Sequence, residues 1–336
     1  MQSPTTSFDR SGLLRVTADF ALPVSLAPCV LCGGIDFEPL ARQDRHLLGL
    51  ITVGCRSCGL LQTNPRPDAA GLTEFYTLHY RQLYQGVQDP SSGYIAKFHK
   101  DERLRYTATH LMKALALNDR SVLLDYGCSE GSLFAGLRQA GFGGRLLGVE
   151  PNANFARFAA EAGSAEVAAA IDAFENIDAV VINHALEHLA DPVGVLRDIA
   201  LRLAPGGLLY LDVPDADRYA HVGDLHLAHI VHFTGRTLPA LVSAAGFRVL
   251  SCEPHDPPHH PFSLRLLATR ALPADALPGV ALRSRNPASE SDTWQHLRAM
   301  DGRAWRWVLS QRLARLGPVR MAYHQLRRWL APRAGR

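Results

Sequence analysis

The chain has 336 residues, a length that suits two domains or one domain with extensions. Its formal net charge of +3 gives no reason to expect a nucleic-acid partner, and 47% hydrophobic residues are enough for a sizeable core. No apolar run approaches the roughly 18 residues of a transmembrane helix, and the N-terminus lacks the pattern of a signal peptide. We therefore expect a cytoplasmic protein.

Four of the six cysteines form two matched pairs near the N-terminus. Cys29 and Cys32, and then Cys55 and Cys58, stand in Cys-x-x-Cys motifs that are each followed by glycine. Two such motifs complete a tetrahedral Cys₄ site, which has no open position for a substrate. We predict one structural zinc ion in a zinc-ribbon module over residues 1–70. A redox-active dithiol pair or disulfides are the alternatives, and the lack of a secretion signal disfavours them.

Residues 71–120 form a connector that is rich in tyrosine. Tyr76, Tyr80 and Tyr84 follow an Asn-Pro-Arg-Pro turn. These side chains line either a substrate cleft or a packed interface between domains, and the sequence leaves both interpretations open. Residues 94–117 predict a helix that leads into the next domain.

Residues 122–150 carry the most informative pattern of the chain. An apolar run ends in Asp125, a turn with Gly127 and Gly131 follows, and a second apolar run ends in Glu150 after a helical segment. This order predicts a β-turn-α-β unit that holds a nucleoside, with the ribose hydroxyls on the Glu150 carboxylate. The turn lacks the Gly-x-Gly-x-x-Gly pattern of pyrophosphate sites. Asp125 would repel a pyrophosphate but could hold an ammonium group.

The turn from Asp125 to Gly131 resembles motif I of the class I S-adenosylmethionine-dependent methyltransferases, with Ser129 in place of the commoner glycine. The segments EHLADP and LAPGG further on are also typical of that superfamily, so that the resemblance covers about residues 94–270. It implies an α/β fold with a seven-stranded, mostly parallel, Rossmann-like sheet, and S-adenosylmethionine as cofactor. An ordinary βαβ unit of another α/β fold is the alternative. The cofactor-binding residues that we expect are Asp125, Gly127, Cys128, Gly131, Glu150, Pro151 and Asn183.

Histidines gather in the second half of the chain. His184 and His188 follow the apolar strand predicted at 177–183, with Glu187 between them. Parallel sheets bind ligands at the carboxyl ends of their strands, so we expect Glu187 and His188 at the catalytic edge. The histidine pair would hold a metal only if a third ligand joined it. A structural polar pair at the start of a helix is the alternative.

The cysteine module and the tyrosine-rich connector resemble those of methyltransferases of sugar and surface-polysaccharide pathways, including deoxysugar C-methyltransferases. When the segments are aligned on Phe233, His229 matches a histidine of the C-methyltransferases, whereas Ala228 replaces their catalytic glutamate and His232 their tyrosine. The resemblance therefore implies O-methylation of a nucleotide sugar or glycan, with His229 as the general base. A packing or helix-capping role is the alternative for His229. A sugar C-methyltransferase and a non-catalytic cofactor-binding scaffold are the alternatives for the whole chain.

We expect the catalytic domain to cover residues 121–270, followed by a linker over 271–292 and a basic helical extension over 293–336. The last 35 residues hold nine arginines and no lysine, aspartate or glutamate. This composition suits contact with anionic lipid at the inner face of a membrane. Helices that pack on the catalytic domain with their arginines in solvent are the alternative.

Overall fold

The computed structural model describes residues 13–15, 21–45, 50–80, 100–258, 262–271, 287–307 and 309. Within them, no helix is long and apolar enough to cross a membrane. Tyr84 and the extension beyond residue 309 lie outside these residues, as does most of the expected linker.

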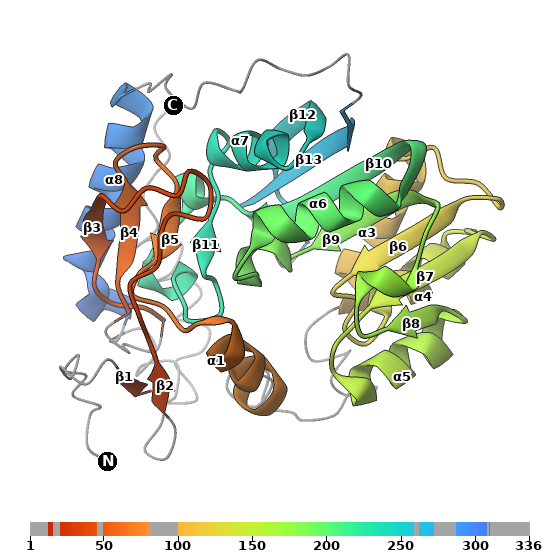
Figure 1. Cartoon of the computed structure of the whole chain (residues 1–336), viewed down its shortest axis with the longest axis horizontal. Coiled ribbons are helices and arrows are strands. Elements are labelled where there is room, and N and C mark those ends of the chain that lie inside the picture. The colour runs from red at the N-terminus through yellow and green to blue at the C-terminus, as the bar shows by residue number, and fades with distance from the viewer. Residues whose placement is uncertain are drawn as a thin grey trace.

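A seven-stranded sheet organises the second half of the chain (Figure 1). Its order is β12-β13-β10-β9-β6-β7-β8. The five strands from β10 to β8 run parallel, and β13 is antiparallel to both β10 and β12. The expected α/β fold is confirmed. The strands are β6 (Val122–Tyr126), β7 (Arg145–Val149), β8 (Glu166–Ala168), β9 (Ile177–Asn183), β10 (Leu203–Pro214), β12 (Phe247–His255) and β13 (Ser263–Arg270).

Helices cover both faces of this sheet because successive strand residues point to opposite sides. Leu123 and Val181 pack in one buried cluster with α3 and α4, whereas Leu124 and Val180 pack in another with α6 and α7. The helices are α3 (Lys100–Ala114), α4 (Ser132–Gln139), α5 (Ala153–Gly163), α6 (Pro192–Arg202) and α7 (Thr237–Ala244). Short 3₁₀ turns lie between them at η3 (Ile171–Ala173), η4 (Leu186–His188), η5 (Ala216–Arg218) and η6 (Val222–Asp224).

The N-terminal part forms a second, smaller sheet. A hairpin of β1 (Leu13–Arg15) and β2 (Ala21–Pro23) precedes the strands β3 (Phe37–Ala41), β4 (Thr52–Cys55) and β5 (Leu61–Thr63). The short strand β11 (Val231–His232) pairs with β5 and completes the order β11-β5-β4-β3. The small sheet therefore extends beyond the module expected at residues 1–70 and takes one strand from the range 121–270 expected for the catalytic domain. Helix α1 (Ala69–Glu74) and the π-helical turn η1 (Phe75–His79) follow β5.

Helix α8 (Pro287–Asp301) packs on this smaller sheet, on the side away from the seven-stranded sheet (Figure 1). The Trp294 ring lies so close to Gly54 that a Cβ added there would stand 2.5 Å from it. Asp301 accepts hydrogen bonds from the amides of Arg42 and Gln43, at 2.8 and 3.1 Å. The helix begins inside the expected linker 271–292. It contacts the N-terminal sheet and also the segment after β10, where Thr293 donates to Asp217 and His296 lies 2.6 Å from the carbonyl oxygen of Tyr219.

Candidate active site

The expected nucleoside turn lies at the carboxyl ends of β6 and β7. Gly127 and Gly131 have φ angles of +82° and +75°, and the Glu150 carboxylate accepts the amides of Ser129 and Asn152, at 3.1 and 2.9 Å. A carboxylate can accept more than two hydrogen bonds, so Glu150 both fixes the turn and suits a pair of ribose hydroxyls.

The two glycines are also required by the packing of the protein itself. A Cβ on Gly131 would stand 2.7 Å from the Cα of Ala159 in α5. A Cβ on Gly127 would stand 2.9 Å from the Cβ of Ala185, in the loop between β9 and η4. The turn therefore lies directly against the segment that carries His184, Glu187 and His188.

Three carboxyl groups surround the turn. Asp125 is buried, and burial together with Glu130 and Glu150 raises its pKa to about 7. Glu130 accepts hydrogen bonds from the hydroxyls of Ser129 and Ser132, at 2.6 and 2.5 Å. A positively charged ligand would offset the repulsion among these groups. These acidic side chains therefore fit S-adenosylmethionine, which carries both an ammonium and a sulfonium group.

The remaining expected cofactor residues differ in their surroundings. The Cys128 thiol lies over Gly148, where an added Cβ would stand 2.7 Å from its sulfur, and burial raises the pKa of the thiol above its usual value. Asn183 ends β9 beside Asp212 of β10, at the same edge as the turn. Pro151 is exposed directly after Glu150. The side chain of Cys128 thus fills space beside the sheet, and only its backbone forms part of the turn.

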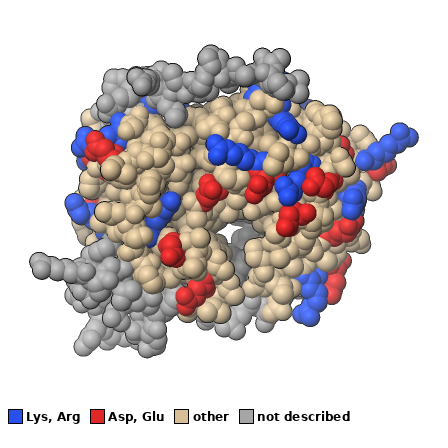
Figure 2. All heavy atoms as spheres, viewed as in Figure 1, with Lys and Arg blue, Asp and Glu red and all other residues tan. Residues whose placement is uncertain are grey.

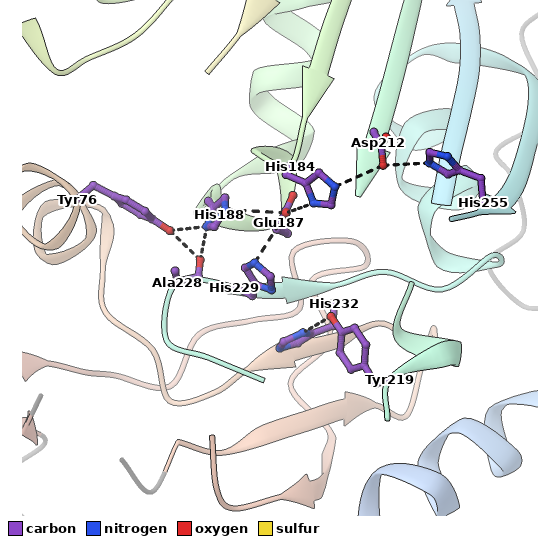
Figure 3. A network of polar contacts seen from close by, with 10 residues as sticks. All are labelled: Tyr76, His184, Glu187, His188, Asp212, Tyr219, Ala228, His229, His232 and His255. Carbon is purple, nitrogen blue, oxygen red and sulfur yellow. Dashed lines mark hydrogen bonds and ion pairs between the residues drawn. The ribbon is translucent and has the colours of Figure 1, made fainter. Parts of the chain in front are cut away.

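A network of imidazoles and carboxylates crosses the carboxyl ends of β9, β10 and β12 (Figure 3). Glu187 lies at its centre, with its Oε1 atom 3.5 Å from His184 Nδ1, 3.9 Å from His188 Nε2 and 3.8 Å from His229 Nε2. His184 also lies 3.6 Å from Asp212, and the His255 imidazole approaches the same carboxylate at 3.2 Å. All three expected catalytic residues, Glu187, His188 and His229, are thus brought together.

The orientation of His188 is set by the connector. Its Nδ1 atom lies 2.7 Å from the carbonyl oxygen of Ala228 and 2.8 Å from the hydroxyl of Tyr76, which itself donates to the same carbonyl at 2.7 Å. A carbonyl oxygen only accepts, so Nδ1 carries the proton and Nε2 carries the lone pair of the neutral ring. Tyr76 and Tyr80 lie with their rings against His188, which connects the tyrosines to the site.

His229 lies in the segment that joins the two sheets. Its backbone carbonyl accepts the hydroxyl proton of Thr63 in β5, and the next amide, of Ile230, donates to the carbonyl of Glu187. Burial, followed by the neighbouring His226 and His188, holds the pKa of His229 well below its usual range. The imidazole is therefore neutral at neutral pH.

His232 has a structural environment. It is buried in β11, its Nδ1 atom lies 3.0 Å from the hydroxyl of Tyr219, and burial lowers its pKa to about 4. Sequence reasoning missed Glu130, Asp212, His226 and His255 as parts of the two sites. Only Glu130 had a local signal, since it lies inside the turn, whereas the others come from strand ends and loops that meet only in the fold.

This face of the molecule is hollowed beside the site. Figure 2 shows the hollow at the position where Figure 1 places α1 on one side and β8 with α5 on the other.

The four paired cysteines also meet. The sulfur atoms of Cys29 and Cys58, and those of Cys32 and Cys55, lie 3.5 Å apart, and all four lie within 4.8 Å of one another. The two motifs have the same backbone geometry, because the amides of Gly33 and Gly59 each donate to the carbonyl of the first cysteine at 2.8 Å. For bonds of about 2.3 Å, tetrahedral ligands stand about 3.8 Å apart, so the cluster fits a zinc ion.

The chain was compared with known proteins. Residues 99–252 match the methyltransferase domain family, and no curated protein is significantly similar to the chain. Solved structures of similar fold include 1,6-didemethyltoxoflavin-N1-methyltransferase of Burkholderia thailandensis with bound S-adenosylhomocysteine. It is 21% identical, with a TM-score of 0.42 over 54% of this chain and 87% of that chain.

An S-adenosylmethionine-dependent methyltransferase of Mesorhizobium loti is 18% identical, with a TM-score of 0.40 over 51% of this chain and all of that chain. Similarities of this extent carry no information about the acceptor. The family match covers the strands from β6 to β10 and the first part of β12, and it includes the turn at Asp125 and Glu150. Residues 99–252 of the chain therefore form a methyltransferase domain, and the turn at Asp125 and Glu150 inside it suits S-adenosylmethionine.

Proposed function

We propose that the chain methylates a hydroxyl group of a sugar, in a nucleotide sugar or a glycan. The observation that carries the proposal is the cluster of Glu187, His188 and His229 beside the cofactor turn. The segment that carries Glu187 and His188 lies against this turn, with Ala185 next to Gly127. When bound, S-adenosylmethionine supplies an electrophilic methyl group that an oxygen attacks in line. The chain has to orient the acceptor and accept the hydroxyl proton, because a neutral alcohol is a poor nucleophile.

His229 is the first candidate for the base. Its ring is neutral, it belongs to the segment that resembles the sugar methyltransferases, and its Nε2 lies near a carboxylate that would stabilise the imidazolium formed by proton transfer. His188 is the second candidate, held by Tyr76 and the Ala228 carbonyl. Glu187 would support either imidazole.

C-methylation of a sugar is the second candidate function, and one observation favours it. The segment that carries His229 has Ala228 where the C-methyltransferases have glutamate, but Glu187 places a carboxylate 3.8 Å from His229 from another element. A carboxylate and a histidine are therefore present together, as abstraction of a proton from carbon would require.

The proposal includes a structural zinc ion on Cys29, Cys32, Cys55 and Cys58, and it is supported by the matched geometry of the two motifs. It also includes a cytoplasmic location and contact of the arginine-rich C-terminal segment with anionic lipid, both of which rest on the sequence.

Incubation with labelled S-adenosylmethionine and a panel of nucleotide sugars and glycolipids tests the acceptor class. His229→Ala should lower turnover by about 10²–10⁴-fold and leave cofactor affinity nearly unchanged. His221→Ala is the matched control, because His221 also contacts a carboxylate but lies directly before η6, outside the network. Label that reaches no sugar while another class of acceptor is methylated would contradict the proposal.

A further inference from the structure

We propose that Glu187, His188 and His229 bind a divalent first-row transition-metal ion. One ligand atom from each residue lies within 4.8 Å of the other two. The site is separate from the four cysteines and offers nitrogen and oxygen donors instead of sulfur. Binding of the ion does not depend on the proposed function, whereas the role of the ion rests on it.

Glu187 has the environment of a metal ligand. Its side chain is 2% exposed, and neither carboxylate oxygen accepts a hydrogen bond from any residue that the structure describes. Within the described residues its ion pairs are with histidines alone, at 3.5 to 3.9 Å, which is longer than a hydrogen bond. A buried carboxylate without donors is costly, and a cation among these atoms would remove that cost.

The two histidines present the lone pairs that a metal requires. His188 donates from Nδ1 to the carbonyl of Ala228, so its Nε2 lone pair faces Glu187. Metal-binding histidines usually donate their other nitrogen to a carbonyl or carboxylate in this way. The Nε2 atom of His229 faces the same carboxylate oxygen, at 3.8 Å.

The distances and the donor types define the class of ion. For metal–ligand bonds of about 2.0–2.1 Å, tetrahedral ligand atoms stand about 3.4 Å apart. Glu187 Oε1 lies 3.9 Å from His188 Nε2 and 3.8 Å from His229 Nε2, so each separation needs to shorten by about half an ångström. Two imidazoles and one carboxylate suit Zn²⁺, Fe²⁺ or Co²⁺ and leave positions open for an exogenous ligand. His184 lies on the other side of Glu187 and connects it to Asp212, which would hold the carboxylate in place.

An ion at this position gives the site a way to activate an acceptor hydroxyl. A hydroxyl that binds the ion has a lowered pKa, so its proton can leave to water without a strong base. The three residues would then act together as ligands, and His229 need not take the proton.

Titration with CoCl₂, followed by visible absorption, tests the site in the full-length protein. We expect one Co²⁺ per chain with weak bands, and without the intense thiolate charge-transfer absorption that binding to the cysteines would give. Glu187→Gln keeps the shape of the side chain and removes its charge, so it should weaken Co²⁺ binding by about tenfold or more. His188→Gln should have the same effect, and both variants should retain S-adenosylmethionine affinity as proof of folding.

His221→Gln is the matched control, since His221 and Asp224 form a similar half-buried histidine–carboxylate pair, 3.4 Å apart, outside the network. It should bind Co²⁺ as the unaltered protein does. The absence of Co²⁺ binding, or binding that is unchanged in Glu187→Gln and His188→Gln, would overturn the inference and leave His229 as the proposed base. Co²⁺ binding without methylation of any sugar would instead refute the proposed function and leave the metal site standing.

Discussion

The carboxyl group of Asp125 shows how burial sets the charge of the cofactor site. Burial and the nearby Glu130 and Glu150 raise its pKa from 3.8 to about 7. Its ionised form is therefore unfavourable in the cofactor-free protein and is needed when a cation binds. The group contributes stability that is fully present below its unfolded pKa of 3.8 and is lost progressively as the pH rises through about 7.

Asp125→Asn should therefore raise the melting temperature of the cofactor-free protein above pH 7 and leave it nearly unchanged below pH 3.8. The same variant should bind S-adenosylmethionine more weakly and with little dependence on pH. Affinity in the unaltered protein should increase as the pH rises through about 7. Calorimetric titrations across this range measure both effects, and parallel pH profiles for the two proteins would exclude Asp125 as the cation partner.

At the scale of elements, the cysteine motifs and the small sheet depend on each other. Cys55 ends β4, and the amide of Cys55 is bonded to the carbonyl of Leu60 just before β5. A bound zinc ion would hold both motifs to this hairpin. Metal analysis should find about one zinc ion on the cysteines, in addition to any ion at Glu187.

Removal of the zinc should unfold the N-terminal sheet before the catalytic sheet. Without the ion the two motifs lose the bonds that connect them, and none of their cysteines forms a disulfide. Cys29→Ser should lower the first melting transition, whereas Cys252→Ser, a change outside the cluster, should not. A zinc-free protein with both parts folded would contradict the structural role.

The catalytic sheet could be predicted from sequence because its signals are local. The buried run at β9 and the glycine turn between β6 and α4 each carry their own pattern. The start of α8 could not be predicted, because the Trp294 ring packs against Gly54 in β4, a strand that is far away in the sequence. Nor could the part of the network around Asp212, because His184, Asp212 and His255 meet only when β9, β10 and β12 are assembled.

At the scale of the whole molecule, the N-terminal part is joined to the catalytic sheet at the site itself. Strand β11 belongs to the small sheet, the segment before it carries His229, and Thr63 of β5 bonds to the carbonyl of that histidine. Tyr76, which follows α1, holds His188 from the same side. The N-terminal part thus positions two of the three proposed catalytic side chains.

The most direct test of this account is transfer of a ¹³C-labelled methyl group from S-adenosylmethionine to a sugar acceptor, with the product examined by carbon NMR. The account predicts a signal typical of a methyl ether, which is lost in Glu187→Gln and retained in His221→Gln. A methyl group attached to a sugar carbon would show that Glu187 and His229 abstract a proton from carbon. A product that carries no label in any sugar would contradict the central claim.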